Sequence, residues 1–526
     1  MSVAPAIGID LGTTYCAVAY IDKDGRPLTI TNSYGDLLTP TAILVEDGEI
    51  IIGKEAIKSS AFSPEEFADC FKRDMGSRSF RRTISDIDVP PEVLSGLVLD
   101  RLKADAERKL GMLIEEVVIT VPAFFDESRR KATQDAGKLA GLTVLDVINE
   151  PTAAAVAYGR QIAERADGKA ADTGNLVMVY DLGGGTFDAT LLDISKSEMK
   201  TLATDGDVRL GGKDFDERIL NFAAEEFKKA HGIDPRDDSS DVAQLWIDAQ
   251  EAKHALSERS RTTVVCYQAG IRNRTEITRE QFESLTRDLL ERTESTCSLL
   301  LDEAKKSWSD IDEVLLVGGG SRMPMVMQML KRVSGISPNQ QLAVDEAVAH
   351  GAALYCDSLR KSKSSGKPPA QRLINVNSHS LGIVGREARS KRLVNRILIP
   401  RNTPLPVHTV RQFPMAKANM RSVEIPVMEG ESTRPDQCIQ LGKCVIRDLP
   451  PDLPAGTKVE VRYQYGADGR ISVSARVPVT RQSATVELQR VNASDLGSLE
   501  AWRSKLLMPK QSNGERGSPV IKDARS

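Results

Sequence analysis

The sequence predicts an α/β protein in which a duplicated, two-lobed domain is followed by an antiparallel β-sandwich. Three observations lead to this prediction. One glycine-rich pattern occurs twice, far apart in the chain, which indicates an internal duplication. Strands and helical stretches alternate from Ala4 to about Lys361, as expected of an α/β domain. After a polar linker, the helical period gives way to short strands in which apolar and polar residues alternate.

The most informative stretch is 177–193, VMVYDLGGGTFDATLLD, in which an apolar strand runs into a turn of three glycines. The glycines at 183–185 permit positive φ angles and let bare N–H groups approach an anion. Thr186 adds a hydroxyl, and Asp181 and Asp188 add carboxylates of the kind that hold Mg²⁺ through its water shell. For one such turn alone, the alternative is an ordinary β-turn that requires positive φ.

Recurrence of this pattern favours phosphate binding over coincidental turns. Residues 7–14, IGIDLGTT, repeat the order of apolar strand, Asp-Leu-Gly and hydroxyl groups. Residues 315–322, LLVGGGSR, place a third glycine cluster after an apolar strand. Two Asp-Leu-Gly hairpins therefore predict that the duplicated halves face one nucleotide across a cleft.

Length and composition set limits on the class of protein. At 526 residues and 57.4 kDa, the chain is long enough for two or three domains. Its 70 Lys and Arg against 74 Asp and Glu give a net charge of −4, which offers no general attraction for nucleic acid or anionic membranes. The seven cysteines show no paired CxxC spacing, which favours reduced thiols and no zinc site. We see no signal peptide and no uncharged run as long as a membrane span, so we expect a cytoplasmic protein.

Two charged residues of the first half have alternative interpretations. Lys72 lies within 65–75, EEFADCFKRDM, and is either a solvated lysine at a helix end or a group that faces phosphate. Glu150 follows a strand expected over 144–148 and opens an Ala-rich helix, so it is either a ligand-facing group at a strand end or a helix-capping carboxylate. The other elements expected here are a helix over 93–110, a strand over 116–122 and a helix over 126–141.

The second half offers polar groups on helices beside the expected cleft. A glycine-containing loop at 211–216 precedes a helix over 217–229. Residues 345–353 begin with Asp345 and form a helix of small residues that can pack closely beneath a ligand. A further helix over 245–257 presents four polar residues on or near one face, although each alone is more often an exposed position; they are Gln250, Lys253, His254 and Ser257.

The composition changes at 361–372, KSKSSGKPPAQR, a stretch rich in Ser, Gly and Pro that reads as a flexible linker. After the strands, a helix is expected over 493–507 and a disordered tail over 509–526. The strands expected between linker and helix span 393–399, 405–413, 420–428, 438–446, 459–465 and 471–477.

Together these motifs resemble those of the 70-kilodalton heat-shock chaperone family, the DnaK-type chaperones of the actin and sugar-kinase superfamily. IDLGTT, ITVPAFFDESRRKATQDAGKLAG, INEPTAAAVAYG, DLGGGTFD, LGGKDFDER and VGGGSRMPMV occur in the family's order, and the resemblance covers about residues 4–490. It implies an actin-like, ribonuclease-H-like ATPase domain over 1–360, a linker over 361–376, a peptide-binding β-sandwich over 377–490, and a short helix with a disordered tail but no full lid over 491–526.

The resemblance also implies roles for individual residues. Those implied to order the attacking water and the γ-phosphate are Lys72, Glu150, Thr186 and Asp188. Those implied to hold Mg²⁺ through its waters are Asp10 and Asp181, and those of the interdomain relay are Pro122 and Arg130. Those implied to bind nucleotide are Gly12, Thr13, Thr14, Gly183, Gly184, Gly185, Thr186, Gly211, Gly212, Gln250, Lys253, His254, Ser257, Gly319, Gly320, Arg322 and Asp345. Those aligned with the peptide groove are Ile383, Phe413, Ala416, Val423, Ile425 and Val427, for which core positions are the alternative.

The implied cofactors are ATP or ADP and Mg²⁺, with K⁺ as a further candidate ion. The implied partners are unfolded or partly folded polypeptides, with a J-domain cochaperone and a nucleotide exchange factor as further candidates and no nucleic acid or membrane. Two positions depart from the family's pattern at the nucleotide: Gln250 replaces a glutamate near the ribose, and His254 stands where some members stack an arginine on adenine. Asp146 replaces an arginine that meets the J-domain in many members.

Three other functions fit the nucleotide motifs. A metabolite kinase is the rival within the enzymes, because the superfamily includes sugar kinases. A nucleotide-regulated scaffold without turnover and an actin-type filament protein are the rivals outside them. The β-sandwich after a linker favours the chaperone, and the retained polar residues around the phosphates favour hydrolysis.

Overall fold

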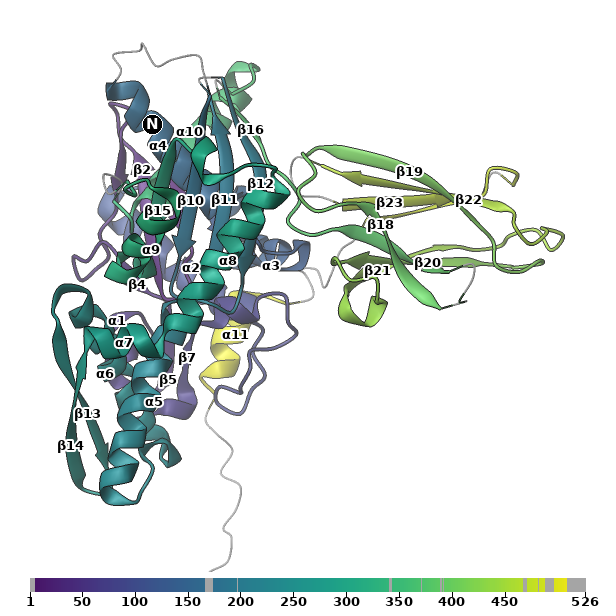
Figure 1. Cartoon of the computed structure of the whole chain (residues 1–526). Coiled ribbons are helices and arrows are strands. Elements are labelled where there is room, and N and C mark those ends of the chain that lie inside the picture. Colours follow the sequence, from purple (N-terminus) through teal and green to yellow (C-terminus); the bar gives the residue numbers. More distant parts are fainter. Residues whose placement is uncertain are drawn as a thin grey trace, which may run out of the picture.

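The computed structural model describes residues 5–165, 174–195, 197–339, 343–369, 371–387, 390, 392–466, 471–480, 482–487 and 496–508. An α/β part contains two main sheets, and a β-sandwich projects from it (Figure 1). No helix in these ranges is long and apolar enough to cross a membrane.

The first main sheet is organised around β1 (Ile7–Asp10), an apolar strand that ends in a carboxylate. It pairs antiparallel with β2 (Tyr15–Ile21) and parallel with β8 (Glu116–Val121). The strand order is β3-β2-β1-β8-β9, and β4 pairs with β2 beside this path. The bounds of the three remaining strands are Pro27–Thr29 for β3, Thr39–Pro40 for β4 and Thr143–Asn149 for β9.

The second main sheet repeats this arrangement around β10 (Asn175–Leu182). This strand pairs antiparallel with β11 (Phe187–Ile194) and parallel with β15 (Glu313–Val317). The strand order is β15-β10-β11-β12-β16, with β12 at Glu198–Asp207. In both sheets, a hairpin whose first strand carries an Asp at or next to its last position lies beside a parallel neighbour, as expected for a duplicated core.

Two helices with small side chains lie between the sheets. They are α4 (Glu150–Arg165) and α10 (Ala347–Ser365), whose alanines share one core with strands of both sheets. The helices approach closely, because a Cβ added to Gly351 would lie 1.7 Å from the carbonyl oxygen of Ala153. The run of small residues therefore fixes the spacing between the two halves.

The remaining elements cover the outer faces of the sheets and form two smaller rim units. One rim unit is built around the strands of 42–69 and the other around the hairpin of 261–278. On the first sheet, α2 (Pro91–Leu110) and α3 (Glu127–Leu139) contribute to one core, and Asp126 caps α3 by accepting a hydrogen bond from the Arg129 amide at 2.9 Å. The other bounds are β5 Ala42–Glu46, β6 Glu49–Ile52, α1 Lys54–Ser59, η1 Pro64–Glu66, β7 Phe67–Asp69, η2 Phe71–Asp74, α5 Gly212–His231, η3 Pro235–Asp237, α6 Ser239–Glu258, β13 Arg261–Gln268, β14 Ile271–Thr278, α7 Arg279–Leu285, α8 Arg287–Glu303, η4 Trp308–Asp310, η5 Gly319–Arg322 and α9 Pro324–Ser334.

The sandwich consists of two four-stranded antiparallel sheets, β18-β17-β20-β21 and β19-β22-β23-β24. Their facing side chains form a separate core, in which the Tyr463 hydroxyl donates to the carbonyl of Gly382 at 2.7 Å. The bounds are β17 Leu381–Arg386, β18 Leu393–Ile399, β19 Val407–Pro414, β20 Val423–Glu429, η6 Pro435–Gln437, β21 Ile439–Ile446, β22 Lys458–Tyr465, β23 Ile471–Arg476 and β24 Ser483–Glu487.

The connection between the two parts differs from the linker predicted over 361–376. Helix α10 continues to Ser365, because Gly366 supplies the positive φ of +66° that ends it. Residues 372–374 then form β16, which pairs in parallel with β12. This strand has three residues, too few to show an alternating pattern, so it depends on backbone groups offered by β12 and on the packing of Leu373, which no local pattern reveals.

A last helix, α11 (Leu499–Leu506), returns to the α/β part and packs on α2 (Figure 1). Its Arg503 donates to Asp100 of α2 at 2.7 Å. Ser498 caps α11 by accepting a hydrogen bond from the Ala501 amide at 3.1 Å. The first residues of the helix predicted over 493–507, and the tail predicted over 509–526, lie outside the described residues.

Candidate active site

The two Asp-Leu-Gly hairpins meet face to face at the centre of the α/β part. A Cβ added to Gly184 would lie 2.1 Å from Thr14 Oγ1, and one added to Gly185 would lie 2.3 Å from Thr13 Cγ2. The loop before α5 packs behind them, since a Cβ on Gly211 would lie 2.5 Å from the Gly185 nitrogen. Glycine is therefore required by close approach at these positions, which brings backbone N–H groups of both halves to one place.

Lys72 is 2% exposed and donates to Glu150 Oε1 at 2.6 Å. Cys70 has a φ of +51°, and the turn that follows carries Lys72 inward on η2. A solvated helix-end position for Lys72 is therefore excluded. Glu150 is the first residue of α4, 8% exposed, and its carboxylate faces this ammonium. The buried pair supports the ligand-facing interpretation of both residues.

Three more carboxylates surround this ion pair. Burial and the charge of Glu150 raise the pKa of Asp10 to about 7 and the pKa of Asp188 to about 8. The same two causes raise the pKa of Asp181 well above its usual range. Burial by itself would lower the pKa of Lys72, but Glu150 and Asp10 hold it above its ordinary value. The cluster therefore contains four carboxylates and one ammonium, a composition that a bound cation would stabilise.

The hydrogen bonds of these carboxylates leave acceptor capacity inside the site. Asp10 accepts from Thr120 Oγ1 at 2.8 Å, and Asp188 Oδ1 accepts from the Phe124 amide at 2.9 Å. Asp188 Oδ2 is buried and has no hydrogen-bond partner among the described residues. A water or hydrated ion would satisfy this atom. The described residues contain no group of three His, Cys, Asp or Glu side chains that could ligate a metal directly.

A cavity of about 710 Å³ opens between the two hairpins. Nearly all residues predicted to bind nucleotide line it, except Gly185 and Gly211, and of the predicted catalytic residues Asp188 does not line it. The predicted residues that line the cavity are Asp10, Gly12, Thr13, Thr14, Lys72, Glu150, Asp181, Gly183, Gly184, Thr186, Gly212, Gln250, Lys253, His254, Ser257, Gly319, Gly320, Arg322 and Asp345.

The end of the cavity remote from Lys72 is built from α6, η5 and the start of α10. Lys253 lies 2.8 Å from Asp216 Oδ1 and donates to the carbonyl of Gly212 at 2.9 Å. Burial and the neighbouring ammonium of Lys253 lower the pKa of His254, which favours the neutral ring. Across the cavity mouth, Arg322 donates to Asp345 at 2.5 Å.

Sequence reasoning gave no role to several residues that complete the site. Arg73 Nε donates to the carbonyl of Gly185 at 2.8 Å, and its guanidinium also binds Asp214. Thr120 orients Asp10, and Asp216 pairs with Lys253. These contacts join elements that are distant in sequence, so no local pattern indicated Thr120 or Asp216. For Arg73, the only signal in the sequence was its position next to Lys72. A second cavity of about 670 Å³ continues the cleft between the rim units.

The predicted relay residues lie between the active site and the sandwich. Arg130 donates to Asn149 at 2.5 Å and to the carbonyl of Val147 at 3.2 Å, so it holds the residue before Glu150. Pro122 precedes the turn that touches the sandwich. In that turn, the Ala123 carbonyl accepts a hydrogen bond from the Ser378 hydroxyl, and the Phe124 carbonyl contacts the His379 ring nitrogen.

Arg401 and Asn402 form further polar contacts between the two parts, and the Asn402 side chain accepts a hydrogen bond from the Thr204 amide at 2.9 Å. Arg401 donates to Glu303 at 3.0 Å and lies 3.4 Å from Asp205. The Ser378 hydroxyl to Ala123 distance is 2.5 Å, and the His379 Nε2 to Phe124 oxygen distance is 3.1 Å.

The residues predicted to line a peptide groove divide into two sets. Ile383, Ile425 and Val427 are 3%, 5% and 0% exposed and belong to the sandwich core. For these three, the alternative interpretation as core residues holds in this structure. Phe413 and Val423 are half-buried against the same core, and Ala416 is exposed in the loop that joins their strands.

Comparison with known proteins gives one consistent result. The model of the family described as Hsp70 protein matches residues 6–91 and 81–506. Chaperone protein DnaK from Thermotoga petrophila is 39% identical over 478 residues, which cover 89% of this chain and 78% of that protein. Chaperone protein DnaK from Halobacterium salinarum is 38% identical over 482 residues, which cover 90% of this chain and 73% of that protein. With these matches over both the α/β part and the sandwich, the chain belongs to the Hsp70 family of ATP-dependent chaperones.

Proposed function

We propose that this chain hydrolyses ATP at the cavity between the two glycine hairpins and couples the reaction to binding and release of unfolded or partly folded polypeptide. The observation that carries the proposal is the buried Lys72–Glu150 pair, 2.6 Å apart, within a cluster of carboxylates at the phosphate end of the cavity. Phosphoryl transfer to water needs positioning and charge neutralisation more than strong base chemistry.

In this proposal, the hairpin N–H groups hold the phosphates and Lys72 contacts the γ-phosphate. Glu150, Thr186 and Asp188 order the attacking water, for which the unpartnered Asp188 Oδ2 supplies an acceptor. Asp10 and Asp181 would hold Mg²⁺ through its waters, and the ion would neutralise charge that develops on the phosphates. K⁺ is a further candidate ion beside these carboxylates.

The nucleoside would occupy the opposite end of the cavity. Lys253 and Ser257 on α6, with Arg322 and Asp345 across the mouth, would contact the ribose and base. His254 is available to stack on adenine as a neutral ring. The division of labour that we propose assigns the ATPase to 1–360, the connection to 361–376, polypeptide binding to 377–490 and a short helix with a tail to 491–526.

The sandwich site that we propose centres on Val423 and Phe413, the half-buried members of the predicted groove. A J-domain cochaperone and a nucleotide exchange factor are proposed as regulators. Asp146 reverses the charge that J-domain partners meet in many relatives, and it accepts a hydrogen bond from the Tyr355 hydroxyl at 2.9 Å. We therefore expect weak stimulation by a standard J-domain protein.

A single-turnover ATPase assay of Lys72→Ala, with and without an unfolded client, tests the proposal. We expect hydrolysis to fall by about 100-fold or more while ATP still binds, because the ammonium acts mainly on charge that develops in the transition state. Lys54→Ala is the matched control, since Lys54 forms an exposed 3.3 Å pair with Asp36 outside the site. Hydrolysis by Lys72→Ala at the wild-type rate would remove Lys72 from the mechanism.

A further inference from the structure

The sandwich differs sharply in charge from the rest of the chain. Residues 377–490 contain eighteen Lys and Arg and ten Asp and Glu, a net charge of +8. The whole chain has a net charge of −4, so the remainder carries −12. A basic module attached to an acidic one attracts acidic ligands to the basic part selectively, although the average charge of the protein conceals this.

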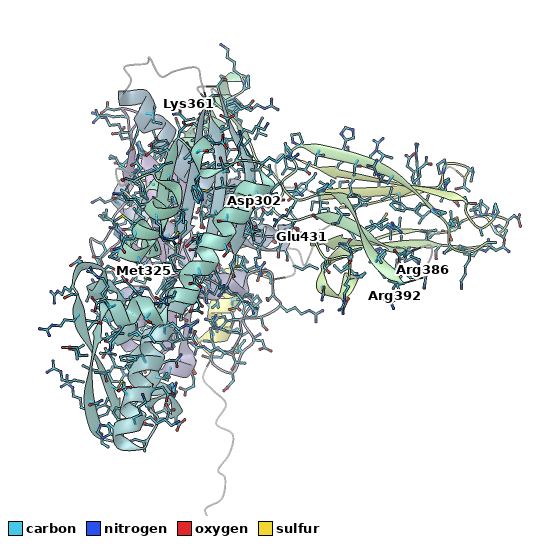
Figure 2. All side chains as sticks on the ribbon, viewed as in Figure 1. Asp302, Met325, Lys361, Arg386, Arg392 and Glu431 are labelled. Atoms are coloured by element: carbon cyan, nitrogen blue, oxygen red, sulfur yellow. The ribbon has the colours of Figure 1, made fainter. Side chains whose placement is uncertain are left out.

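Part of this positive charge lies at the end of the sandwich where the proposed groove opens. Strands β17 and β20 are antiparallel, with Ile383 opposite Val427, so the end of β17 and the start of β20 lie at the same end of their sheet. Arg386 and Arg392, which flank the connection from β17 to β18, therefore lie at the same end as the residues that lead into Val423. Figure 2 shows Arg386 and Arg392 on the sandwich, farther from the α/β part than Glu431.

Several basic side chains at this end have no carboxylate partner among the residues that the structure describes. Arg392, Lys417 and Arg421 are exposed, and no ion pair joins them to any described residue. Of the acidic residues nearby, Glu424 lies 3.2 Å from Lys443 and Glu387 accepts a hydrogen bond from Ser390 at 2.5 Å. Asp448 and Asp452 are exposed in the segment whose backbone bonds to 419–421, and no ion pair between described residues joins them to Arg392, Lys417 or Arg421. The positive charge of these loops is therefore available to a ligand.

Apolar surface accompanies the charge. On β18, Leu393 is 54% exposed and Ile397 is 40% exposed, beside the exposed Arg392 and Arg396. Val423 is half-buried at the start of β20. A ligand that covers this end must therefore satisfy apolar and cationic groups that alternate over short distances.

We propose that the sandwich selects client segments in which apolar residues are flanked by Asp and Glu. This inference rests on the proposed function, namely that the sandwich binds polypeptide near Val423. Carboxylates of the client would meet Arg392, Lys417 and Arg421, while its aliphatic side chains cover Leu393 and Val423. A nucleic acid fits less well, because the exposed apolar side chains beside the arginines are aliphatic, whereas bases stack on aromatic ones.

Three fluorescent peptides with one apolar core, flanked by Glu, Gln or Lys, test the selection on the full chain. We expect the Glu-flanked peptide to bind about tenfold more tightly than the Lys-flanked one at about 50 mM salt, and the difference to shrink at about 300 mM. Val423→Phe should weaken all three peptides. Failure of the Gln-flanked peptide to bind, or its indifference to Val423→Phe, would count against the proposed function itself.

Arg392→Glu with Lys417→Glu should abolish the preference and leave binding of the Gln-flanked peptide within about twofold. Arg272→Glu with Arg274→Glu on β14 is the matched control, since it makes the same charge change at exposed positions far from the sandwich. Equal affinity for the three peptides, or a preference for Lys, would overturn the inference. It would also be overturned if a single-stranded RNA or a phosphatidylserine vesicle, rather than any peptide, lost binding in the double variant.

Discussion

The Lys72–Glu150 pair is buried, so its contribution to the stability of the fold depends on the charges around it. Removing one member of a buried pair commonly costs about 3–5 kcal/mol, because the other remains without compensation. Here Asp10, Asp181 and Asp188 add negative charge, and Lys72 is the ammonium that acts on all three. Substitutions in this cluster will therefore change stability as well as turnover, and a melting curve must accompany each kinetic measurement.

For Mg²⁺, the proposed roles of Asp10 and Asp181 give a specific expectation. Asp181→Asn, and separately Asp10→Asn, should raise the Mg²⁺ concentration for half-maximal single turnover by about 10–100-fold, because each removes a carboxylate that orients the ion's waters. Titration of Mg²⁺ at saturating ATP measures the shift. Asp193→Asn, an exposed position on the same hairpin, should leave the titration unchanged. Unaltered Mg²⁺ dependence in both site variants would refute the assignment.

At the scale of elements, the sequence was most informative where local patterns are strong. Apolar runs ended by glycine, such as β10, and the amphipathic period of α2 predicted those elements closely. The strand β16 was not predicted, since its pairing depends on the distant strand β12. The same reason explains which parts of the site could be predicted. Motifs identified Lys72 and the hairpins, whereas the Arg73–Asp214 contact depends on how elements distant in sequence are placed in space.

His379 makes one of the element contacts dependent on pH. Burial lowers the pKa of its ring. The hydrogen bond with Glu431 and the nearby acidic charge raise the pKa by more than burial lowers it, so the net pKa lies above the ordinary value. Because the pKa in the folded chain is higher than the ordinary value, protonation stabilises the folded surroundings of His379, chiefly its contact with Glu431 and to a smaller extent that with the Phe124 carbonyl. This contribution to stability is complete below the ordinary histidine pKa of about 6.5 and is lost as pH rises through the raised pKa of the folded chain.

Hydrogen exchange of residues 372–379 between about pH 6 and pH 8.5, corrected for intrinsic rates, measures this effect. We expect protection to decrease as pH rises, and His379→Gln to remove that dependence. His408→Gln is the control, because His408 is exposed on β19. Protection that rises with pH, or an unchanged pH dependence in His379→Gln, would contradict the assignment.

For the whole molecule, the contacts between the two parts are mostly polar and small. Among the described residues they include the pairing of β16 with β12, the Ser378 and His379 contacts with the turn after β8, the ion pairs of Arg401, and the hydrogen bond from the Thr204 amide to Asn402. Polar contacts of this kind suit reversible docking, because water can replace each of them when the parts separate. Nucleotide-dependent movement of the sandwich therefore needs no disruption of either core.

The position of α11 leads to an expectation about peptide release. This helix lies on α2, where Leu499 and Leu506 join the core of the first lobe, and not over the sandwich (Figure 1). In this arrangement α11 does not cover peptide bound at the sandwich, so no contact with this helix must break for release. We expect ATP to accelerate release from the 526-residue chain by less than about tenfold relative to ADP, as measured by stopped-flow with a fluorescent peptide.

Leu506→Asp tests whether α11 affects peptide release, because a buried carboxylate against α2 should detach the helix. We expect release with ADP to be unchanged in this variant and in the control Leu299→Asp, whose leucine is 60% exposed on α8. A different result would be informative about mechanism. Slow release in ADP, accelerated by orders of magnitude in ATP and altered by Leu506→Asp, would mean that the segment containing α11 closes the groove when it leaves α2.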